Sequence, residues 1–366
     1  MTRIVVDLLF MTGRRGGMET YVRELYARLP AEMPGVEFIA LASAELAQDG
    51  AAWFPGRVID TGVRASSRGR WALGELLLIP RLARRERADL VHCPANFGPR
   101  RSAMPVVLTL HDVLGHRHPE FVPGAHAPLV RRLVEWAARG AARILTVSRA
   151  SADDIVDLLG IDAARVVVTP LSGGQATAAD DRPAVVDAAR QRPVLLAAGN
   201  RMPHKNLERL LEALALIPLA ERPQLILTGG GEGDALLSLV ARLGLHDRVR
   251  IAGWVSAEEL EELYQRATLI VQPTLFEGFG LPVLEAMARG RPVLCSDLPV
   301  LREVGGEAAL YMDTTDPGLI AEAIKDALAD RARLDVLAVR GRERASRFTW
   351  QRTATQTAAV FYSVLA

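Results

Sequence analysis

Lysine is almost absent from this sequence. Lys205 and Lys325 are the two lysines among 44 basic residues, and all the others are arginine. The chain therefore uses arginine wherever a positive charge alone is needed. A lysine retained against this background points to a position that needs a compact ammonium charge, which a planar guanidinium does not provide. We interpret Lys325 as chance, whereas Lys205 lies inside a motif.

Cysteines and long apolar runs are also scarce. The two cysteines, Cys93 and Cys295, lie far apart, which favours buried thiols in a reduced, cytoplasmic setting over a disulfide framework. No segment reaches the roughly 18 uninterrupted apolar residues that suggest a membrane-spanning helix. The first residues, MTRIVVD, predict a strand rather than a secretory signal.

A strong net charge is missing as well. The formal charge is +1 over 366 residues, which argues against a general nucleic-acid-binding protein. Seven arginines lie within residues 64–87, together with Trp71 and several leucines. A basic amphipathic helix of this kind can lie on an anionic surface, so one interpretation is peripheral contact with the inner face of a membrane. The other is a helix that covers a sheet and has an arginine-rich outer face.

The order of apolar segments predicts an α/β protein of two domains. The length favours two domains, and 49% hydrophobic residues supply two cores. Short apolar runs alternate with amphipathic stretches, which predicts parallel sheets covered on both faces. Strands are expected at 4–6, 36–41, 89–92, 105–110, 143–147, 166–168, 194–198, 224–227, 249–252, 269–272 and 292–295. Helices are expected at 19–29, 70–87, 128–139, 151–159, 206–216, 235–243, 257–266, 282–289 and 350–365, with Ser151 capping the fourth.

Composition also predicts where the domains meet. Residues 173–192 are rich in Gly, Ala and Asp and are interpreted as a linker. The expected organisation is a Rossmann-like domain over 1–172, a second one over 193–349, and a terminal helix over 350–366. Ligands of such sheets bind at the carboxyl ends of the strands, so two facing domains would enclose a cleft for two substrates.

The most informative motif is FEGFGLPVLE, residues 276–285. It follows a predicted strand and opens a helix near Pro282, a residue favoured in a first helical turn. Its glycines allow close approach of a ligand, and the free amides of the helix start can bind a phosphate. Glu277 and Glu285 can both point toward the strand ends and accept from sugar hydroxyls. The alternative interpretation is an ordinary glycine-rich turn with two solvated glutamates.

Two further loops join a strand to a helix. GNRMPHKN, residues 199–206, puts Arg201 and Lys205 beside a helix start, where a diphosphate would meet cations and amides together. A basic loop with an asparagine cap is the alternative. TGGGEG, residues 228–233, permits close contact with a base or ribose but lacks the acidic residue of a dinucleotide-binding fingerprint.

Together these motifs resemble the retaining glycosyltransferases of family 4, which have the GT-B fold, and especially their mannosyltransferase-like group. The resemblance covers nearly the whole chain. It rests on two glutamates with seven residues between them and on matching segments, which are AGNRMPHKNLERLLEAL, FEGFGLPVLEAMARGRPVLCSD, VSAEELEEL, LREVGGEAA, GGME at 16–19, His111-Asp112 and ILTVSRASA at 144–152.

The resemblance implies a role for each matching residue. The first domain would bind the acceptor and the second the nucleotide-sugar donor. The catalytic set would be His111, Arg201, Lys205 and Glu277. The donor would be bound by Gly16, Gly17, Gly199, Arg201, Lys205, Gly230, Trp254, Val255, Glu277, Gly278, Phe279, Gly280, Leu281 and Glu285. The terminal helix that begins at Trp350 would cross back to the first domain.

The resemblance also implies the reaction. A hexose would pass, with retained configuration, from a nucleoside diphosphate to a hydroxyl of a glycan, lipid or secondary metabolite. The lysine–asparagine loop with a His-Asp pair favours GDP-mannose, with a UDP-sugar as the alternative. Many relatives have arginine where this chain has Asn200 or His204, so the role of Arg201 is an inference from its neighbourhood. No Asp-x-Asp occurs in the sequence, so we predict transfer without a metal or other cofactor.

Three alternatives stay open at this stage. His111 could be a structural histidine bonded to Asp112 or to backbone, and His116 with His118 could belong to a metal site. A sugar-nucleotide 2-epimerase would share the fold but would need no acceptor site. A non-catalytic sugar-nucleotide-binding protein would be expected to have lost the lysine or a glutamate, and neither is lost.

Overall fold

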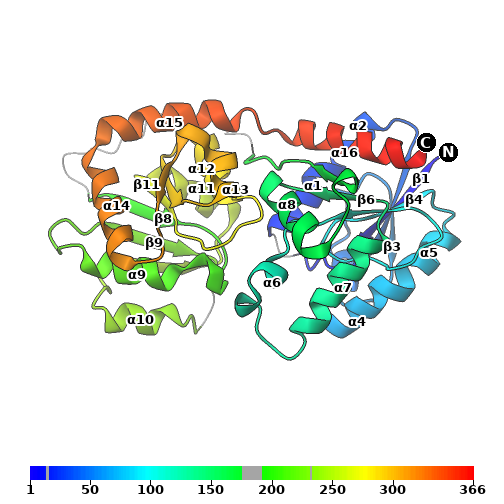
Figure 1. Ribbon diagram of the computed structural model, residues 1–366, viewed down its shortest axis with the longest axis horizontal. Helices are drawn as coiled ribbons and strands as arrows, with labels where there is room; N and C mark the ends of the chain where they lie inside the picture. The colour runs from blue at the N-terminus through cyan, green and yellow to red at the C-terminus, as the bar shows by residue number, and fades with distance from the viewer. Residues whose placement is uncertain (14–15, 175–191, 231–232) are drawn as a thin grey trace. The chain divides into compact units, whose positions relative to one another are not determined.

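The computed structural model describes residues 1–13, 16–174, 192–230 and 233–366, which form two compact units (Figure 1). The first unit comprises Met1–Leu171 and Thr349–Ala366, and the second comprises Ser172–Phe348. Most of the predicted linker, 175–191, lies outside the described residues, as do Gly231 and Glu232 of the third loop. In the described part of the chain, no helix has the length and apolarity to cross a membrane.

The first unit is built on seven parallel strands in the order β3-β2-β1-β4-β5-β6-β7. The order reverses direction between β1 and β4, and in open parallel sheets ligands bind outside the carboxyl ends of the strands at such a point. The edge strand β3 was not predicted, because its residues are only half-buried and carry charges at both ends. The strands are Arg3–Leu8, Glu37–Ala42, Arg57–Asp60, Leu90–Cys93, Val106–Thr109, Arg143–Thr146 and Val166–Val168.

Helices cover this sheet, and several of them differ from the prediction. The short helices Ala44–Gln48 and Leu114–Arg117 were not predicted, and the helix expected at 19–29 is Gly17–Tyr26 followed by a separate short helix, Leu29–Glu32. The single helix expected at 70–87 is interrupted by a π-helical turn, Gly74–Leu78, between α4 and α5. The helix expected to begin at Ser151 begins earlier, because Ser148 is the cap and accepts the amide of Ser151 at 3.0 Å. The helices are α1 Gly17–Tyr26, α2 Leu29–Glu32, α3 Ala44–Gln48, α4 Arg68–Leu73, α5 Ile79–Arg85, α6 Leu114–Arg117, α7 Ala127–Gly140 and α8 Arg149–Leu159.

The last helix, α16 (Trp350–Leu365), belongs to the first unit although the second unit precedes it in the sequence. It contacts α1, α2, β4 and β6, and Figure 1 shows it in red beside the blue α1 and α2. Trp350 and Phe361 are buried in this contact. The Thr353 hydroxyl donates to the carbonyl of Pro170 at 2.5 Å, which ties the helix to the end of the first part of this unit, residues 1–171.

The second unit has six parallel strands in the order β10-β9-β8-β11-β12-β13, with the reversal between β8 and β11. Its strands are Val194–Ala197, Gln224–Thr228, Val249–Gly253, Leu269–Gln272, Val293–Ser296 and Leu310–Met312, numbered β8 to β13 in chain order. Its helices are α9 Leu207–Leu216, α10 Leu236–Arg242, α11 Ala257–Arg266, α12 Leu281–Ala288, α13 Pro299–Gly305, α14 Pro317–Ala329 and α15 Arg331–Ala345. The predicted α/β class with two Rossmann-like parallel sheets is confirmed.

Candidate functional site

Lys205 and Glu277 form an ion pair at the carboxyl ends of the strands of the second unit. Lys205 follows β8 in the turn before α9, and Glu277 follows β11 in the loop before α12. The Lys205 ammonium lies 2.6 Å from Oε1 of Glu277, and their side chains are only 12% and 10% exposed. The Gln272 amide also donates to that oxygen, at 3.4 Å. The two motifs singled out from the sequence therefore meet in one place.

Backbone contacts hold these two loops against each other. Asn206, with a φ of 57°, donates through its side-chain amide to the carbonyls of Pro273 and Thr314, both at 3.1 Å. The amide of Leu275 donates to the carbonyl of His204 at 2.7 Å. The lysine is thus held on a loop whose position is set by the glutamate loop, and this fixes the distance between them.

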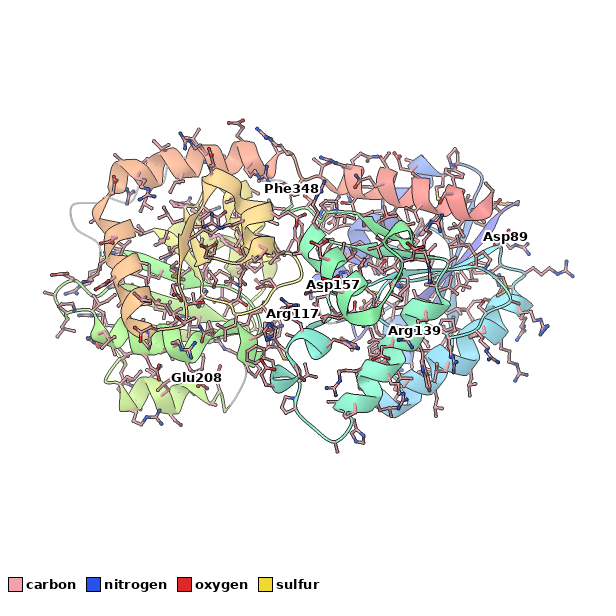
Figure 2. All side chains as sticks on the ribbon, in the orientation of Figure 1. Asp89, Arg117, Arg139, Asp157, Glu208 and Phe348 are labelled. Atoms are coloured by element: carbon pink, nitrogen blue, oxygen red, sulfur yellow. The ribbon has the colours of Figure 1, made fainter. Side chains whose placement is uncertain are left out.

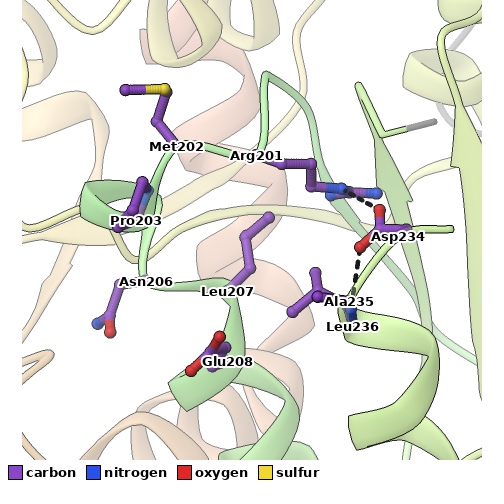
Figure 3. Close-up of a pocket in the computed structure, with 9 residues that line it drawn as sticks. All are labelled: Arg201, Met202, Pro203, Asn206, Leu207, Glu208, Asp234, Ala235 and Leu236. Carbon is purple, nitrogen blue, oxygen red and sulfur yellow. Dashed lines mark hydrogen bonds and ion pairs between the residues drawn. The ribbon is translucent and has the colours of Figure 1, made fainter. Parts of the chain in front are cut away.

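Arg201 lies with a different partner. Its Nε donates to Oδ2 of Asp234 at 2.9 Å, and Figure 3 shows its side chain directed at this carboxylate. Among the described residues, its two terminal nitrogens have no hydrogen-bond partner although they are buried. A cavity of about 360 Å³ opens beside this pair, with Met202, Leu207 and Leu236 among its lining residues. Arg201 thus has donors available next to a cavity. Its ion pair is with Asp234, whereas Lys205 and Glu277 pair with each other.

The loops at 199–206 and 228–233 come close together at Gly199 and Gly229. A Cβ on Gly229 would lie 1.7 Å from the carbonyl oxygen of Gly199, and Gly229 has a φ of 81°. A Cβ on Gly230 would lie 2.2 Å from Oδ2 of Asp234 and 3.0 Å from Nε of Arg201. Gly199 itself has a φ of 139° and open space above it. Glycine is required at Gly229 by this crossing, independently of any ligand, whereas at Gly230 a side chain would displace the side chains of Asp234 and Arg201.

α12 begins where the motif predicts the start of a helix. Gly280 precedes the helix with a φ of 95°, and Leu281 is its first residue. Phe279 is buried, and its ring lies 6.0 Å from that of Phe348, which Figure 2 labels. Gly278 leads from Glu277 into this turn. The first amides of a helix lack intrahelical acceptors, so this end of α12 is suited to an anion.

Glu285 is held from the side by an aromatic residue that the sequence did not single out. The Tyr264 hydroxyl of α11 donates to Oε2 of Glu285 at 3.0 Å. The Arg289 guanidinium lies 4.8 Å from the Tyr264 ring and bonds Glu261 at 2.6 Å. Burial raises the pKa of the Glu285 carboxyl, and the nearby guanidinium and the hydroxyl act to lower it. Among the described residues, no hydrogen bond to the other carboxylate oxygen is found, so it can accept from a further donor.

Trp254 and Val255 follow β10 at the same edge of the sheet. The Trp254 side chain is 69% exposed, and Val255 is half-buried. An exposed indole of this size offers an apolar face to an aromatic or sugar ring.

His111 follows β5 in the first unit and is held by backbone. Its Nε2 lies 2.9 Å from the carbonyl of Pro94, and its amide donates to Asn96 at 2.7 Å. A carbonyl only accepts, so Nε2 carries the proton and Nδ1 has a free lone pair. Burial lowers the pKa of this imidazole to about 4. His111 is therefore neutral at neutral pH. The bond to backbone that the structural alternative predicts is present, and Nδ1 can still accept a hydrogen bond.

A buried polar network lies behind His111. The Tyr21 ring meets the imidazole edge-on at 5.0 Å, and the Tyr21 hydroxyl lies 3.2 Å from that of Thr109. His92 lies between Thr109 (2.9 Å) and the Tyr26 hydroxyl (2.7 Å). Burial lowers the pKa of His92 to about 3. None of these groups was predicted, because they lie inside strands and helices whose apolar pattern alone indicated core.

Gly16 and Gly17 lie at the start of α1, after β1. Among the residues that the structure describes, a Cβ at either position would meet no atom within 4 Å, so their packing does not require glycine there. Glu19 in the first helical turn accepts from the amide of Thr12 at 2.8 Å, which closes the loop. This open backbone is available to a ligand.

The histidines considered for a metal site have separate partners. His116 faces Glu135 at 3.4 Å, and His118 faces Glu120 at 3.0 Å. Within the described ranges, Asp7, Glu75 and Cys93 form the group with metal-ligand geometry, and all three are buried. Burial raises the pKa of both carboxyls, which favours a shared proton between them.

Two family models together match most of the chain. "Glycosyltransferase Family 4" matches residues 15–171, and "Glycosyl transferases group 1" matches residues 180–344. O-antigen chain mannosyltransferase B of Escherichia coli is 35% identical over 290 residues, covering 75% of this chain and 74% of that protein. The MMP alpha-(1->4)-mannosyltransferase of Mycolicibacterium hassiacum is 32% identical, covering 77% of this chain and 72% of that protein.

Solved structures share the fold over nearly every residue. Sucrose-phosphate synthase from Thermosynechococcus elongatus has a TM-score of 0.78 at 22% identity, covering 99% of both chains. Anabaena Alr3699/HepE in complex with UDP-glucose has a TM-score of 0.74 at 20% identity, covering 99% of this chain and all of that one.

Proposed function

Because this chain belongs to glycosyltransferase family 4 and is a GT-B glycosyltransferase, we propose that it transfers mannose from GDP-mannose to a hydroxyl of a glycan. Two relatives that are at least 32% identical are named mannosyltransferases, and one of them carries the O-antigen chain in its name. The lysine–asparagine loop and the His-Asp pair support the same donor. The alternatives are a UDP-sugar, which the Anabaena complex contains, and a lipid or secondary-metabolite acceptor.

The Lys205–Glu277 pair carries this proposal. A buried ammonium beside the amides of a helix start is an electrostatic site prepared for the charge that develops on a departing diphosphate. In the proposal, the diphosphate binds Lys205 and the amides at Gly278, Phe279, Gly280 and Leu281. Glu277 turns to the hydroxyls of the transferred sugar.

The remaining residues complete the donor site. The free oxygen of Glu285 accepts from ribose, and Gly199 and Gly230 leave room for the nucleoside. Trp254 and Val255 lie next to the base. Arg201 supplies its two terminal nitrogens to the diphosphate after leaving Asp234. The second unit is the donor domain in this proposal.

The first unit binds the acceptor. Gly16 and Gly17 offer an open backbone, and Nδ1 of His111 accepts a hydrogen bond from a sugar hydroxyl. During transfer, the bond between the anomeric carbon and the diphosphate oxygen breaks, and a bond to the acceptor oxygen forms on the same face. Because the new bond forms on the same face, the configuration is retained. The acceptor proton passes to the departing phosphate oxygen. Two cations and helix amides serve the leaving group, which supports transfer without a metal.

Calorimetric titration with GDP and with UDP, in EDTA, tests the donor site. We expect one nucleotide to bind and its affinity to fall at least tenfold in Lys205→Ala, since a charge-assisted bond is lost. Lys325→Ala, which changes the other lysine, is the matched control and should bind normally. If neither nucleotide binds, or if both variants lose binding equally, the assignment of Lys205 to the diphosphate is wrong.

The stereochemistry is tested separately, by proton NMR of the glycosidic bond formed from GDP-mannose. An α-linked product is the expected result. Mass spectrometry of the quenched enzyme adds a second arm, because a mannosyl group attached covalently to Glu277 would replace the same-face mechanism by double displacement.

A membrane surface is a second partner favoured by a specific observation. Leu73 and Leu77, one helical turn apart, are 59% and 68% exposed, and the exposed Arg81, Arg84 and Arg85 follow them. We propose that this face binds anionic lipid. Flotation with phosphatidylserine vesicles should recover the native chain, and recovery should fall in Leu73→Gln/Leu77→Gln. Leu216→Gln, at another exposed leucine, is the control, and equal recovery of all three would remove the proposal.

A further inference from the structure

A second cavity lies in the second unit, at the opposite ends of the strands from the donor loops. Its volume is about 290 Å³. One wall is formed by residues just before β11 and β12, which are Thr268, Arg291 and Pro292. The other wall belongs to α15 and includes Arg331, Val339 and Arg342. The donor loops follow the carboxyl ends of β8, β9, β10 and β11, at the opposite edge of the same parallel sheet. The cavity is therefore separate from the donor site.

The cavity is strongly cationic. Arg291, Arg331 and Arg342 line it, and Asp335 is the acidic residue among its described lining residues. Asp335 is largely exposed and lies 3.6 Å from Arg331, a distance at which a surface pair contributes little. Arg291 is only 6% exposed, so its charge lies within the wall rather than in solvent.

Gly290 allows one of these arginines to reach the cavity. Its φ is 61°, and a Cβ there would lie 1.8 Å from Nη1 of Arg342. The guanidinium of Arg342 thus occupies the space that a side chain at position 290 would fill, next to Arg291. Within the ranges that the structure describes, no ion pair or side-chain hydrogen bond of Arg342 is found.

Guanidinium groups gathered around one cavity repel each other unless an anion lies between them. The planar fork of arginine matches the oxygen geometry of phosphate, and its charge strengthens these hydrogen bonds. Pro292, Leu334 and Val339 add apolar wall that the carbons of a small ring can cover. At the small end of the range for ligand sites, the volume excludes a whole nucleotide-sugar.

We propose that this cavity is a second ligand site, which binds a phosphorylated metabolite of about the size of a monosaccharide phosphate. Arg342 contacts the phosphate, Arg291 adds its charge from within the wall, and Val339 contacts the carbon skeleton. The site is independent of the donor sugar, because no residue of the donor loops lines it.

The test is calorimetric titration of the full chain at about 0.15 M salt with glucose 6-phosphate, inorganic phosphate and glucose. Lys205→Ala serves as the background, so that the diphosphate site contributes little. We expect glucose 6-phosphate to bind more tightly than phosphate, and glucose not to bind. Arg342→Gln should weaken binding at least tenfold, whereas Arg340→Gln, at an exposed position of α15 outside the cavity, should leave it unchanged.

Three results would overturn the proposal. They are no binding of glucose 6-phosphate, equal loss in both arginine variants, and affinity for phosphate as high as for glucose 6-phosphate. Thermal unfolding of each variant without ligand shows whether it is folded. If Arg342→Gln is unfolded, Val339→Asp, at a 60% exposed position, repeats the test by placing a negative charge in the wall.

Discussion

Tyr264 shows how one hydroxyl can set the state of a binding carboxylate. Its bond to Glu285 acts to lower the pKa of a carboxyl that burial raises. The bond also leaves the carboxylate in one orientation, with one oxygen unused. Tyr264 is therefore a positioning residue for the proposed contact of Glu285 with ribose.

We predict that Tyr264→Phe weakens nucleotide binding by about fivefold at pH 7, the value of one ordinary hydrogen bond. Without the hydroxyl, the pKa of Glu285 rises further, so the pH at which affinity increases moves upward. Titration with the nucleotide from pH 5 to 9 measures this shift. A 2′-deoxynucleotide should be less sensitive to the variant, and an unchanged pH profile would leave Tyr264 with only a packing role.

His92 makes the stability of the first unit depend on pH. Its pKa is lowered to about 3 by burial, from an ordinary value of 6.5. The unfolded chain therefore binds a proton between these values while the folded chain does not. The stability that depends on neutral His92 is complete above pH 6.5 and declines as the pH falls below it.

We predict that His92→Gln lowers the free energy of unfolding at pH 8, where its hydrogen bonds to Tyr26 and Thr109 are lost. The difference from the native chain should shrink by about 2 kcal/mol on going to pH 5, because only the native chain loses stability through this histidine. Urea unfolding at both pH values measures it. The same change at exposed His126 is the control, and a constant difference would contradict the prediction.

Single residues were predictable where they repeat a local pattern and not where the partner is distant. Lys205 and Glu277 were found from their loops. Asp234 was not, because it lies 33 residues from Arg201 and meets it only through the pairing of neighbouring strands. As a result, the sequence grouped Arg201 with Lys205 as cations for a diphosphate and did not indicate the carboxylate partner that the structure gives it.

At the scale of elements, the crossing of two loops decides the shape of the nucleoside region. Gly229 donates its amide to the carbonyl of Gly253 at 2.5 Å and leaves no room for a side chain against Gly199. Three strand ends are thereby joined by glycine backbone.

We predict that Gly229→Ala lowers stability by clearly more than Gly244→Ala. Both glycines have positive φ, so each substitution carries about 1 kcal/mol of backbone strain. Only Gly229 has backbone in the way, and the Gly199 loop must move to accommodate a methyl group. Thermal unfolding and nucleotide titration of both variants check this. Equal losses would mean that the loops part without effect.

Elements were predicted well where apolar residues recur with a clear period. Most of the parallel strands of both units and α16 follow such patterns, whereas β13 and the helices α13, α14 and α15 were not predicted. The π-helical turn at Gly74–Leu78 was missed, because apolar spacing does not report a local change of hydrogen-bond register. The strand at Arg57–Asp60 was missed because a half-buried edge strand lacks an apolar run.

At the scale of the whole molecule, the division of the chain between units is the main feature. Alternating strands and helices predicted two sheets, and the fold agrees. That the terminal helix packs in the first unit could not be read from its amphipathic pattern, which fits any sheet. It came only from the resemblance to a family.

We predict that Phe361→Ala lowers the stability of the first unit by about 3–5 kcal/mol, as large cavities in a core do. Phe361 is fully buried beside His92, at 5.1 Å between ring centres. Hydrogen exchange should accelerate in peptides of residues 1–171 and not in those of 192–348. Tyr362→Ala, at the exposed neighbouring position, is the control, and uniform acceleration would show that the units unfold together.

The position of α16 also bears on how the protein is made. A ribosome delivers the first unit before the second, at roughly 5–20 residues per second, so the face that receives α16 waits on the order of ten seconds or more. During that time the nascent first unit exposes the apolar surface that Trp350 and Phe361 later cover. We therefore expect chaperones to bind the emerging chain there. The unit that is synthesised first is the one that is completed last.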